Sequence, residues 1–170
     1  MTRHLLITAL PGAGKTTVIR RVAAERDPQT LSGFYTEEMR MGGARRGFRL
    51  VPFHGEPVLI AHVELPKTHR VGKYGVDVAA IDAAAKAALA ARAGTTLYLV
   101  DEIGKMECLS ERFVSLTRDL VEGSLPVIAT VAKRGGGFIA EVKRREDCEL
   151  WTLTRANRDA MPFEIINRTH

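Results

Sequence analysis

The stretch that decides the fold is "ALPGAGKTT", residues 9–17. It follows the apolar segment "RHLLITA" (residues 3–9), which is predicted to be a strand, and it leads into a helix predicted over residues 14–25. Residues 9–16 match the pattern Gly-x-x-x-x-Gly-Lys-Ser/Thr, except that alanine replaces the first glycine. A loop of this pattern binds phosphate through inward-pointing N–H groups and the positive end of the helix dipole. We therefore predict a phosphate site at Ala9, Leu10, Pro11, Gly12, Ala13, Gly14, Lys15 and Thr16.

The side chains of this loop have separate expected roles. Lys15 neutralises charge on the β- and γ-phosphates, which makes it a catalytic candidate, and Thr16 supplies a hydroxyl oxygen to Mg²⁺. Thr17 is a weaker candidate for nucleotide binding. Alanine at position 9 suits the turn if its φ is negative. The alternative is a Gly-Pro turn that starts a helix and binds nothing.

An acidic pair follows a second apolar strand. "TLYLV" (residues 96–100) is predicted to be a buried strand, and Asp101 and Glu102 come directly after it. Asp101 is the candidate for holding Mg²⁺ together with Thr16. Glu102 is the candidate for orienting and polarising a water that attacks the γ-phosphate, the alternative being a cap on the next turn. Thr130, near the end of a strand over residues 126–131, offers a hydroxyl to the same water, or is there for strand propensity.

The remaining pattern predicts an α/β fold. Strands alternate with helices over residues 77–92 and 137–145, which indicates crossover connections and a mostly parallel sheet with helices on both faces. Residues 33–63 read as an antiparallel hairpin or edge insertion, and residues 65–76 as a loop. Further strands are expected over residues 149–154 and 163–166. No linker divides the chain, so residues 1–170 are interpreted as a single domain.

Composition narrows the class of protein. Hydrophobic residues make up 45% of the chain and charged residues 26%, and no apolar run is long enough to cross a membrane, so a cytoplasmic protein is expected. Two cysteines do not form a disulfide framework. The net charge of +5 permits a nucleic-acid partner but does not require one. The sequence does not define the oligomeric state, and it is compatible with a monomer.

Several motifs occur together from one end of the chain to the other. "LPGAGKTT", "GFYTEEMR", "RVGKYGVDV", "DEIGKME" and "LTRANRDAMP" appear in this order. Together they resemble the THEP-type, or cancer-related, nucleoside-triphosphatases. The resemblance implies a RecA-like P-loop NTPase fold and slow, Mg²⁺-dependent hydrolysis of ATP, GTP, CTP and other nucleoside triphosphates. It also implies a second nucleotide-binding segment, formed by Leu99, Val100, Asp101, Glu102, Ile103, Gly104, Lys105 and Met106.

Weaker candidates lie outside these two segments. Arg40 is a candidate for lining the site, and Arg45 or Arg46 of the same hairpin is a candidate for supplying positive charge to the triphosphate. The alternative is a solvated basic hairpin. Asn157 and Arg158 are candidates for contact with the nucleobase, where a guanidinium stacks on any base.

Two other functions compete with nucleoside-triphosphate hydrolysis. A nucleotide or nucleoside kinase shares the phosphate loop, but Glu102 directly after Asp101 favours water as the acceptor. A nucleic-acid-dependent ATPase switch fits the basic pI, but the chain lacks a basic strand rich in aromatic residues.

Overall fold

The computed structural model of the chain describes residues 3–169. Nine strands form one mixed sheet in the order β5-β6-β4-β3-β2-β7-β8-β1-β9. The strands are β1 (His4–Thr8), β2 (Leu31–Met41), β3 (Ala44–Pro52), β4 (Val58–His62), β5 (Arg70–Val71), β6 (Tyr74–Val76), β7 (Leu97–Ile103), β8 (Val127–Val131) and β9 (Cys148–Thr152). The helices are α1 (Lys15–Ala24), α2 (Val78–Ala88), α3 (Glu111–Glu122), α4 (Gly137–Lys143) and α5 (Met161–Arg168), with 3₁₀ turns at Pro28–Thr30 and Glu107–Leu109.

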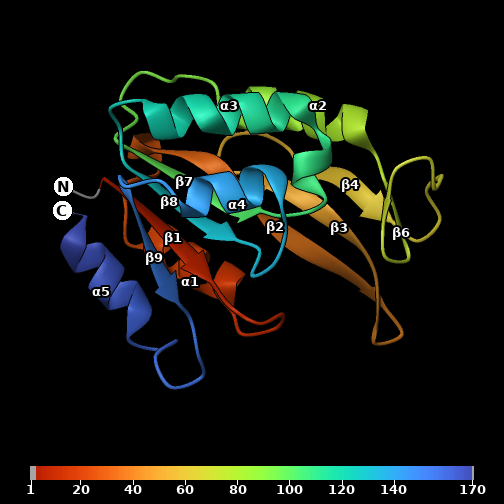
Figure 1. Cartoon of the computed structure of the whole chain (residues 1–170), viewed down its shortest axis with the longest axis horizontal. Helices are drawn as coiled ribbons and strands as arrows, with labels where there is room; N and C mark the ends of the chain where they lie inside the picture. Colours follow the sequence, from red (N-terminus) through yellow and green to blue (C-terminus); the bar gives the residue numbers. More distant parts are fainter. Residues whose placement is uncertain (1–2, 170) are drawn as a thin grey trace.

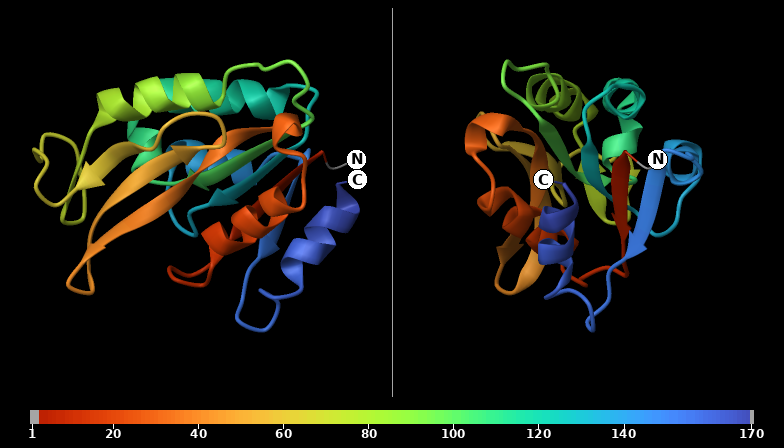
Figure 2. Two further views of the ribbon diagram at one scale, coloured as in Figure 1. Left: turned by 180° about the vertical axis from the view of Figure 1, so that it is seen from behind. Right: turned by 90° about the vertical axis from the view of Figure 1, so that its left-hand side faces the viewer.

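Helices cover both faces of the sheet, as the alternating pattern predicts. In Figures 1 and 2, α2, α3 and α4 lie on one face and α1 and α5 on the other. The first face buries a cluster that includes Ile81 and Phe113, and the second buries one that includes Ile19 and Ile165. Each cluster removes apolar surface from water, which stabilises the fold by about 25 cal/mol per Å². The expected α/β class is therefore confirmed.

The centre of the sheet is parallel and one edge is antiparallel. Strand β2 pairs in parallel with β7, β7 with β8, β8 with β1, and β1 with β9. On its other side β2 pairs with β3, and β3 with β4, in antiparallel register. The segment 33–63 is thus an antiparallel edge as predicted, but its first strand also belongs to the parallel centre.

The approach of β2 to β7 depends on one glycine. Gly33 has a φ of +112°, and a Cβ at this position would lie 1.8 Å from the carbonyl oxygen of Leu99. Any other residue would collide with the β7 backbone, so this position needs glycine both for its conformation and for its size. The hairpin of β2 and β3 continues past this point and projects beyond the rest of the sheet (Figure 1).

Two expectations about secondary structure are wrong. The predicted strand over 163–166 lies in α5, because Met161 and Ile165 are one helical turn apart and both pack against α1, while Pro162 occupies the first turn, where proline is tolerated. The segment 65–76, predicted as a loop, contains the short strands β5 and β6, which extend the antiparallel edge.

No helix within residues 3–169 is long and apolar enough to span a membrane.

Candidate functional site

The phosphate loop connects β1 to α1 in a conformation that needs its glycines. Gly12 and Gly14 have φ values of +78° and +104°, and a Cβ at either position would meet nothing within 4 Å. Their requirement is therefore conformational rather than steric. No described residue other than glycine has a positive φ. Ala9 is 1% exposed and packs in the core below the loop, so the turn accepts alanine where the motif has glycine.

The acidic pair lies in an irregularity of β7 rather than after the end of the strand. Val100 pairs with Ala129 and Ile103 with Val131, so β7 advances one residue further than β8 between these pairs. The extra residue makes a bulge that contains Asp101 and Glu102, whose peptide bond is cis. Bulges re-aim side chains next to binding sites. Here Asp101 is 1% exposed and Glu102 lines the site beside the loop.

Asp101 is the centre of a hydrogen-bond network that joins four elements. Its Oδ2 accepts a bond from the Thr16 hydroxyl at 2.6 Å, and also from the N–H and the hydroxyl of Thr36 on β2, at 3.2 and 3.3 Å. Its Oδ1 accepts a bond from the Thr130 hydroxyl on β8 at 2.6 Å. Burial raises the pKa of Asp101, while the bonds from Thr130, Thr16 and Thr36 act to lower it. Four donors around one carboxylate fix its position.

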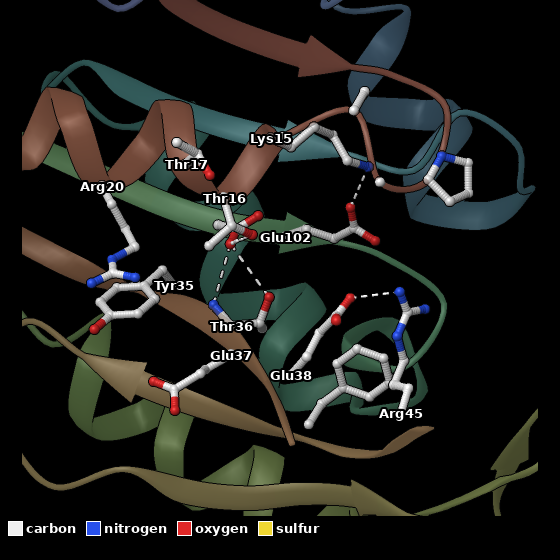
Figure 3. Close-up of a pocket in the computed structure, with 16 residues that line it drawn as sticks. Lys15, Thr16, Thr17, Arg20, Tyr35, Thr36, Glu37, Glu38, Arg45 and Glu102 are labelled. Atoms are coloured by element: carbon white, nitrogen blue, oxygen red, sulfur yellow. Dashed lines mark hydrogen bonds and ion pairs between the residues drawn. The ribbon is translucent and has the colours of Figure 1, made fainter. Parts of the chain in front are cut away.

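Lys15 and Glu102 form an ion pair at the mouth of the loop. The Nζ of Lys15 lies 2.6 Å from Oε2 of Glu102, and the two side chains are 15% and 28% exposed. Figure 3 shows the two side chains meeting end to end, with Lys15 on α1 and Glu102 on β7. The cation predicted to bind phosphate and the carboxylate predicted to activate water are therefore in direct contact.

A second carboxyl group lies close to Glu102. A Cβ on Gly104 would lie 2.5 Å from Oε1 of Glu102 and 2.9 Å from Oε2 of Glu107, so both side chains fold over this glycine. Glu107 is 5% exposed. Burial, together with the charge of Glu102, raises the pKa of Glu107 to about 8. Glu107 is therefore mostly protonated at neutral pH.

The site is a pocket of about 450 Å³ between the phosphate loop and the β2–β3 hairpin. Its hairpin wall carries Thr36, Glu38, Arg45 and Phe48. Arg45 lies 2.6 Å from Glu38 in an ion pair, and its guanidinium lies over the Phe48 ring. Figure 3 shows this pair facing the loop from the opposite wall. The pocket is large enough for a small-molecule ligand.

Some of the weaker candidates lie elsewhere. Arg40 does not line the pocket and bonds to Glu38 and to the carbonyl of Gly43, whereas Arg45 lines the pocket. Thr130 is fully buried and bonds to Asp101, so its hydroxyl is directed at that carboxylate and not at an attacking water. Strand register decides which side chains face a pocket, and it places neither of these two in the lining of this one.

The two residues expected to contact the base, Asn157 and Arg158, lie in different surroundings. A pocket of about 220 Å³ lies behind the loop and is lined by Arg158 together with Ala13, Gly14 and Thr17. The amide group of Asn157 is engaged within its own turn, where it accepts a bond from Thr154 N at 2.7 Å and donates one to Thr152 O at 2.9 Å. Arg158 thus lines a pocket beside the loop, whereas the Asn157 side chain bonds within the turn that holds both residues.

The second predicted segment divides into core and surface. Leu99, Val100 and Ile103 are fully buried in the hydrophobic core. Lys105 and Met106 line a separate cavity that adjoins the site. In the phosphate loop (residues 9–16), Leu10 is 63% exposed and Pro11 lines the pocket. The main chain of both segments positions the site, but only part of their side chains face it.

Several pocket residues were not found by sequence reasoning. Thr36 contacts Asp101, and Arg20 lies over the ring of Tyr35 with both residues lining the pocket. Phe48 was also missed. Arg20 reaches the site from α1, whereas Tyr35, Thr36 and Phe48 reach it because β2 lies next to β7 and β3 next to β2, an order that residue spacing does not reveal. The one available signal is that an aromatic residue and a threonine, "YT", precede two glutamates.

Comparison with known proteins identifies the family. The family model described as NTPase matches residues 4–166. The nucleoside-triphosphatase THEP1 of Thermotoga maritima is 38% identical over 164 residues, which cover 96% of this chain and 93% of that protein. The human cancer-related nucleoside-triphosphatase is 31% identical over 183 aligned residues, with 98% and 96% covered.

Solved structures agree with this assignment. The crystal structure of THEP1 from Aquifex aeolicus superposes with a TM-score of 0.89 at 30% identity, covering 98% of this chain and 99% of that one. The solution structure of the human cancer-related nucleoside triphosphatase gives a TM-score of 0.81 at 30% identity, covering 99% and 98%. This chain therefore belongs to the family of THEP1-type and cancer-related nucleoside-triphosphatases, which are hydrolases with a P-loop NTPase fold.

Proposed function

We propose that this chain hydrolyses nucleoside triphosphates, ATP, GTP and CTP among them, to the diphosphate and inorganic phosphate. The reaction depends on Mg²⁺, and Glu102 activates the attacking water. One observation carries the proposal: Lys15 and Thr16 of the phosphate loop lie 2.6 Å from Glu102 and Asp101, respectively, within a single pocket. Phosphate-binding and water-activating groups are thereby in reach of one triphosphate.

The oxygen donors around Asp101 suit Mg²⁺. Mg²⁺ prefers oxygen ligands and is held in proteins by one or two side chains together with substrate phosphates. Thr16 and Asp101 supply those oxygens, and among residues 3–169 there is no cluster of three or more His, Cys, Asp or Glu side chains that offers a closed metal site of its own. When bound with the nucleotide, the ion would neutralise charge on the β- and γ-phosphates.

The ion pair between Lys15 and Glu102 gives the reaction an order. A bound triphosphate attracts the Lys15 ammonium towards its β- and γ-oxygens, because it carries more charge than one carboxylate. Glu102 is then free to accept a hydrogen bond from water and to take its proton as the water oxygen attacks the γ-phosphorus. The N–H groups around Gly12 and Gly14 hold the phosphates in position, and positioning is the main contribution of a protein to phosphoryl transfer.

Broad base preference is part of the proposal. Arg158 lines the pocket behind the loop and offers a planar guanidinium, which stacks on purines and pyrimidines alike. The hairpin arginines give little support to a requirement for nucleic acid. Arg40 and Arg45 are paired with Glu38, and Arg49 with Glu37, so much of their charge is already neutralised.

The test is initial-rate phosphate release from ATP, GTP, CTP and UTP, with Mg²⁺ and with excess chelator. We expect hydrolysis of all four nucleotides with Mg²⁺ and none with chelator. Lys15→Ala should abolish hydrolysis and weaken nucleotide binding. Lys86→Ala, on the exposed side of α2, is the matched control and should retain wild-type rates. Wild-type turnover in Lys15→Ala would place the active site away from this loop.

A further inference from the structure

A second cavity, called the side cavity here, is continuous with the phosphate site. Its volume is about 370 Å³, within the size range of small-molecule sites. It shares Pro11, Thr36, Arg45, Phe48 and Glu102 with the phosphate site. Its own lining includes Val71, Tyr74, Lys105, Met106, Glu107 and Ala132. Nothing in the hydrolysis of a triphosphate requires this additional space.

The side cavity lies beyond the terminal phosphate. The pocket with Arg158 contacts the loop at Ala13 and Gly14, whereas the side cavity contacts the loop at Pro11. Lys15 and Thr16 line the phosphate site, which lies between these two cavities, and they line neither of the two. A nucleotide with its base near Arg158 therefore directs its γ-phosphate towards the side cavity.

Glu102 stands at the boundary between the two spaces. It lines both, so its carboxylate can contact a group that approaches the γ-phosphate from the side cavity. Glu107 contributes a second carboxyl at the same point, since its Oε2 and Oε1 of Glu102 converge over Gly104, where there is no side chain. A hydroxyl group placed there would meet two carboxyl groups, that of Glu102, which is paired with Lys15, and that of the buried Glu107.

The rest of the side cavity defines the body of a ligand. Val71, Met106, Ala132 and the packed rings of Phe48 and Tyr74, whose centroids are 5.1 Å apart, make its walls largely apolar. Lys105 has no hydrogen-bond or ion-pair partner within the described residues. An apolar wall with one available ammonium matches a small apolar molecule that carries a single anionic group.

We propose that the side cavity binds a small anionic alcohol with an apolar body, and that the γ-phosphoryl group is transferred to its hydroxyl. The alcohol oxygen forms a bond to the γ-phosphorus while the bond from that phosphorus to the β–γ bridging oxygen breaks. The bridging oxygen keeps the electron pair and leaves as part of the nucleoside diphosphate. Glu102 takes the hydroxyl proton and releases it to solvent. The products are a phosphate ester and the diphosphate, and water takes the place of the alcohol when the side cavity contains none.

The experiment compares two products of the same reaction. ATP labelled with radioactive phosphorus in the γ position is incubated with the enzyme, Mg²⁺ and either hydroxypivalate or para-hydroxyphenylacetate, and ADP, inorganic phosphate and labelled ester are measured. The neutral methyl esters of both acids serve as controls for the anionic group. We expect ADP to exceed phosphate with at least one of the two acids, the difference to appear as labelled ester, and the methyl esters to be at least tenfold poorer acceptors.

Variants of the side cavity locate the acceptor. Val71→Trp and Ala132→Leu fill the side cavity from β5 and from the end of β8, and neither residue lines the phosphate site. Ester formation should fall at least tenfold in a variant whose phosphate release without acceptor stays within twofold of wild type. Equal amounts of ADP and phosphate with both acids overturn the proposal. Ester formation that is unchanged in both variants overturns it as well, since the acceptor then binds elsewhere. Phosphate release without acceptor is measured in the same tubes, so failure of hydrolysis is recognised separately.

Discussion

Replacing Glu102 by glutamine tests the centre of the mechanism. Glutamine keeps the length and hydrogen-bonding reach of the side chain but removes its negative charge and its ability to take a proton. The carboxylate lies 2.6 Å from Lys15 in a partly buried ion pair. Two opposite effects are therefore expected: hydrolysis falls, and nucleotide binding becomes tighter.

The sizes of both effects follow from the geometry. A general base contributes roughly 10²–10⁴-fold, and the lower part of that range is expected because the glutamine oxygen still orients water. A partly exposed ion pair contributes up to about 1 kcal/mol. Because about 1.4 kcal/mol corresponds to a factor of ten, freeing Lys15 from its partner should tighten triphosphate binding by about fivefold.

Two measurements on the same preparation separate these effects. Titration calorimetry with a non-hydrolysable ATP analogue and Mg²⁺ gives affinity, and steady-state phosphate release gives turnover. Glu56→Gln, in the exposed connection between β3 and β4, is the control for a change of charge alone. Near-wild-type hydrolysis in Glu102→Gln refutes the role of the carboxylate as base. Weaker analogue binding refutes the idea that the ion pair competes with phosphate.

Three further changes probe the residues around Glu102. Gly104→Ala should lower hydrolysis at least tenfold with little change in affinity, because the new Cβ lies 2.5 Å from Oε1 of Glu102, and unchanged kinetics would contradict this. Asp101→Asn should raise the Mg²⁺ concentration needed for half-maximal activity, as measured by Mg²⁺ titration. The same change should lower the free energy of unfolding by about 1–3 kcal/mol in urea unfolding if the new amide NH₂ faces the N–H of Thr36. Glu107 has a pKa of about 8 in the fold against 4.5 for an exposed glutamate, so between these values the folded state holds more protons than the unfolded state. The free energy of unfolding should therefore fall as pH rises through this range, and this part of the slope should be absent in Glu107→Gln.

The sequence predicts best those parts of the site that are continuous in the chain. The loop with Lys15 is recognised because strand, glycines and helix follow one another directly, and its backbone is determined locally. Asp101 and Glu102 are recognised because they follow an apolar strand, although the bulge that aims them is not visible in the pattern. The role of Thr36 depends on β2 lying beside β7, which is a property of the whole sheet.

The errors have equally physical causes. Arg45 lines the pocket and Arg40 does not, a difference that charge composition cannot predict because the register of β2 against β3 shifts between Met39 and Arg40. The apolar run over residues 163–166 predicts a strand, but the spacing of Met161 and Ile165 gives a helix that packs on α1. Tertiary packing overrides local propensity in short apolar segments of this kind.

The close contact at Gly33 divides the long β2–β3 hairpin into a base that is packed against β7 and a tip that is not. The backbone of β2 lies against β7 at this residue, and Thr36, which bonds to Asp101, follows three residues later in the same strand. The hairpin tip at Gly42 and Gly43 lies at the far end of the same strand, where a Cβ at either glycine would meet nothing within 4 Å. Extra residues inserted at the tip would therefore extend the hairpin outward and leave Thr36 on Asp101. The tip is consequently a suitable place to attach a fluorescent reporter or an affinity tag to this enzyme.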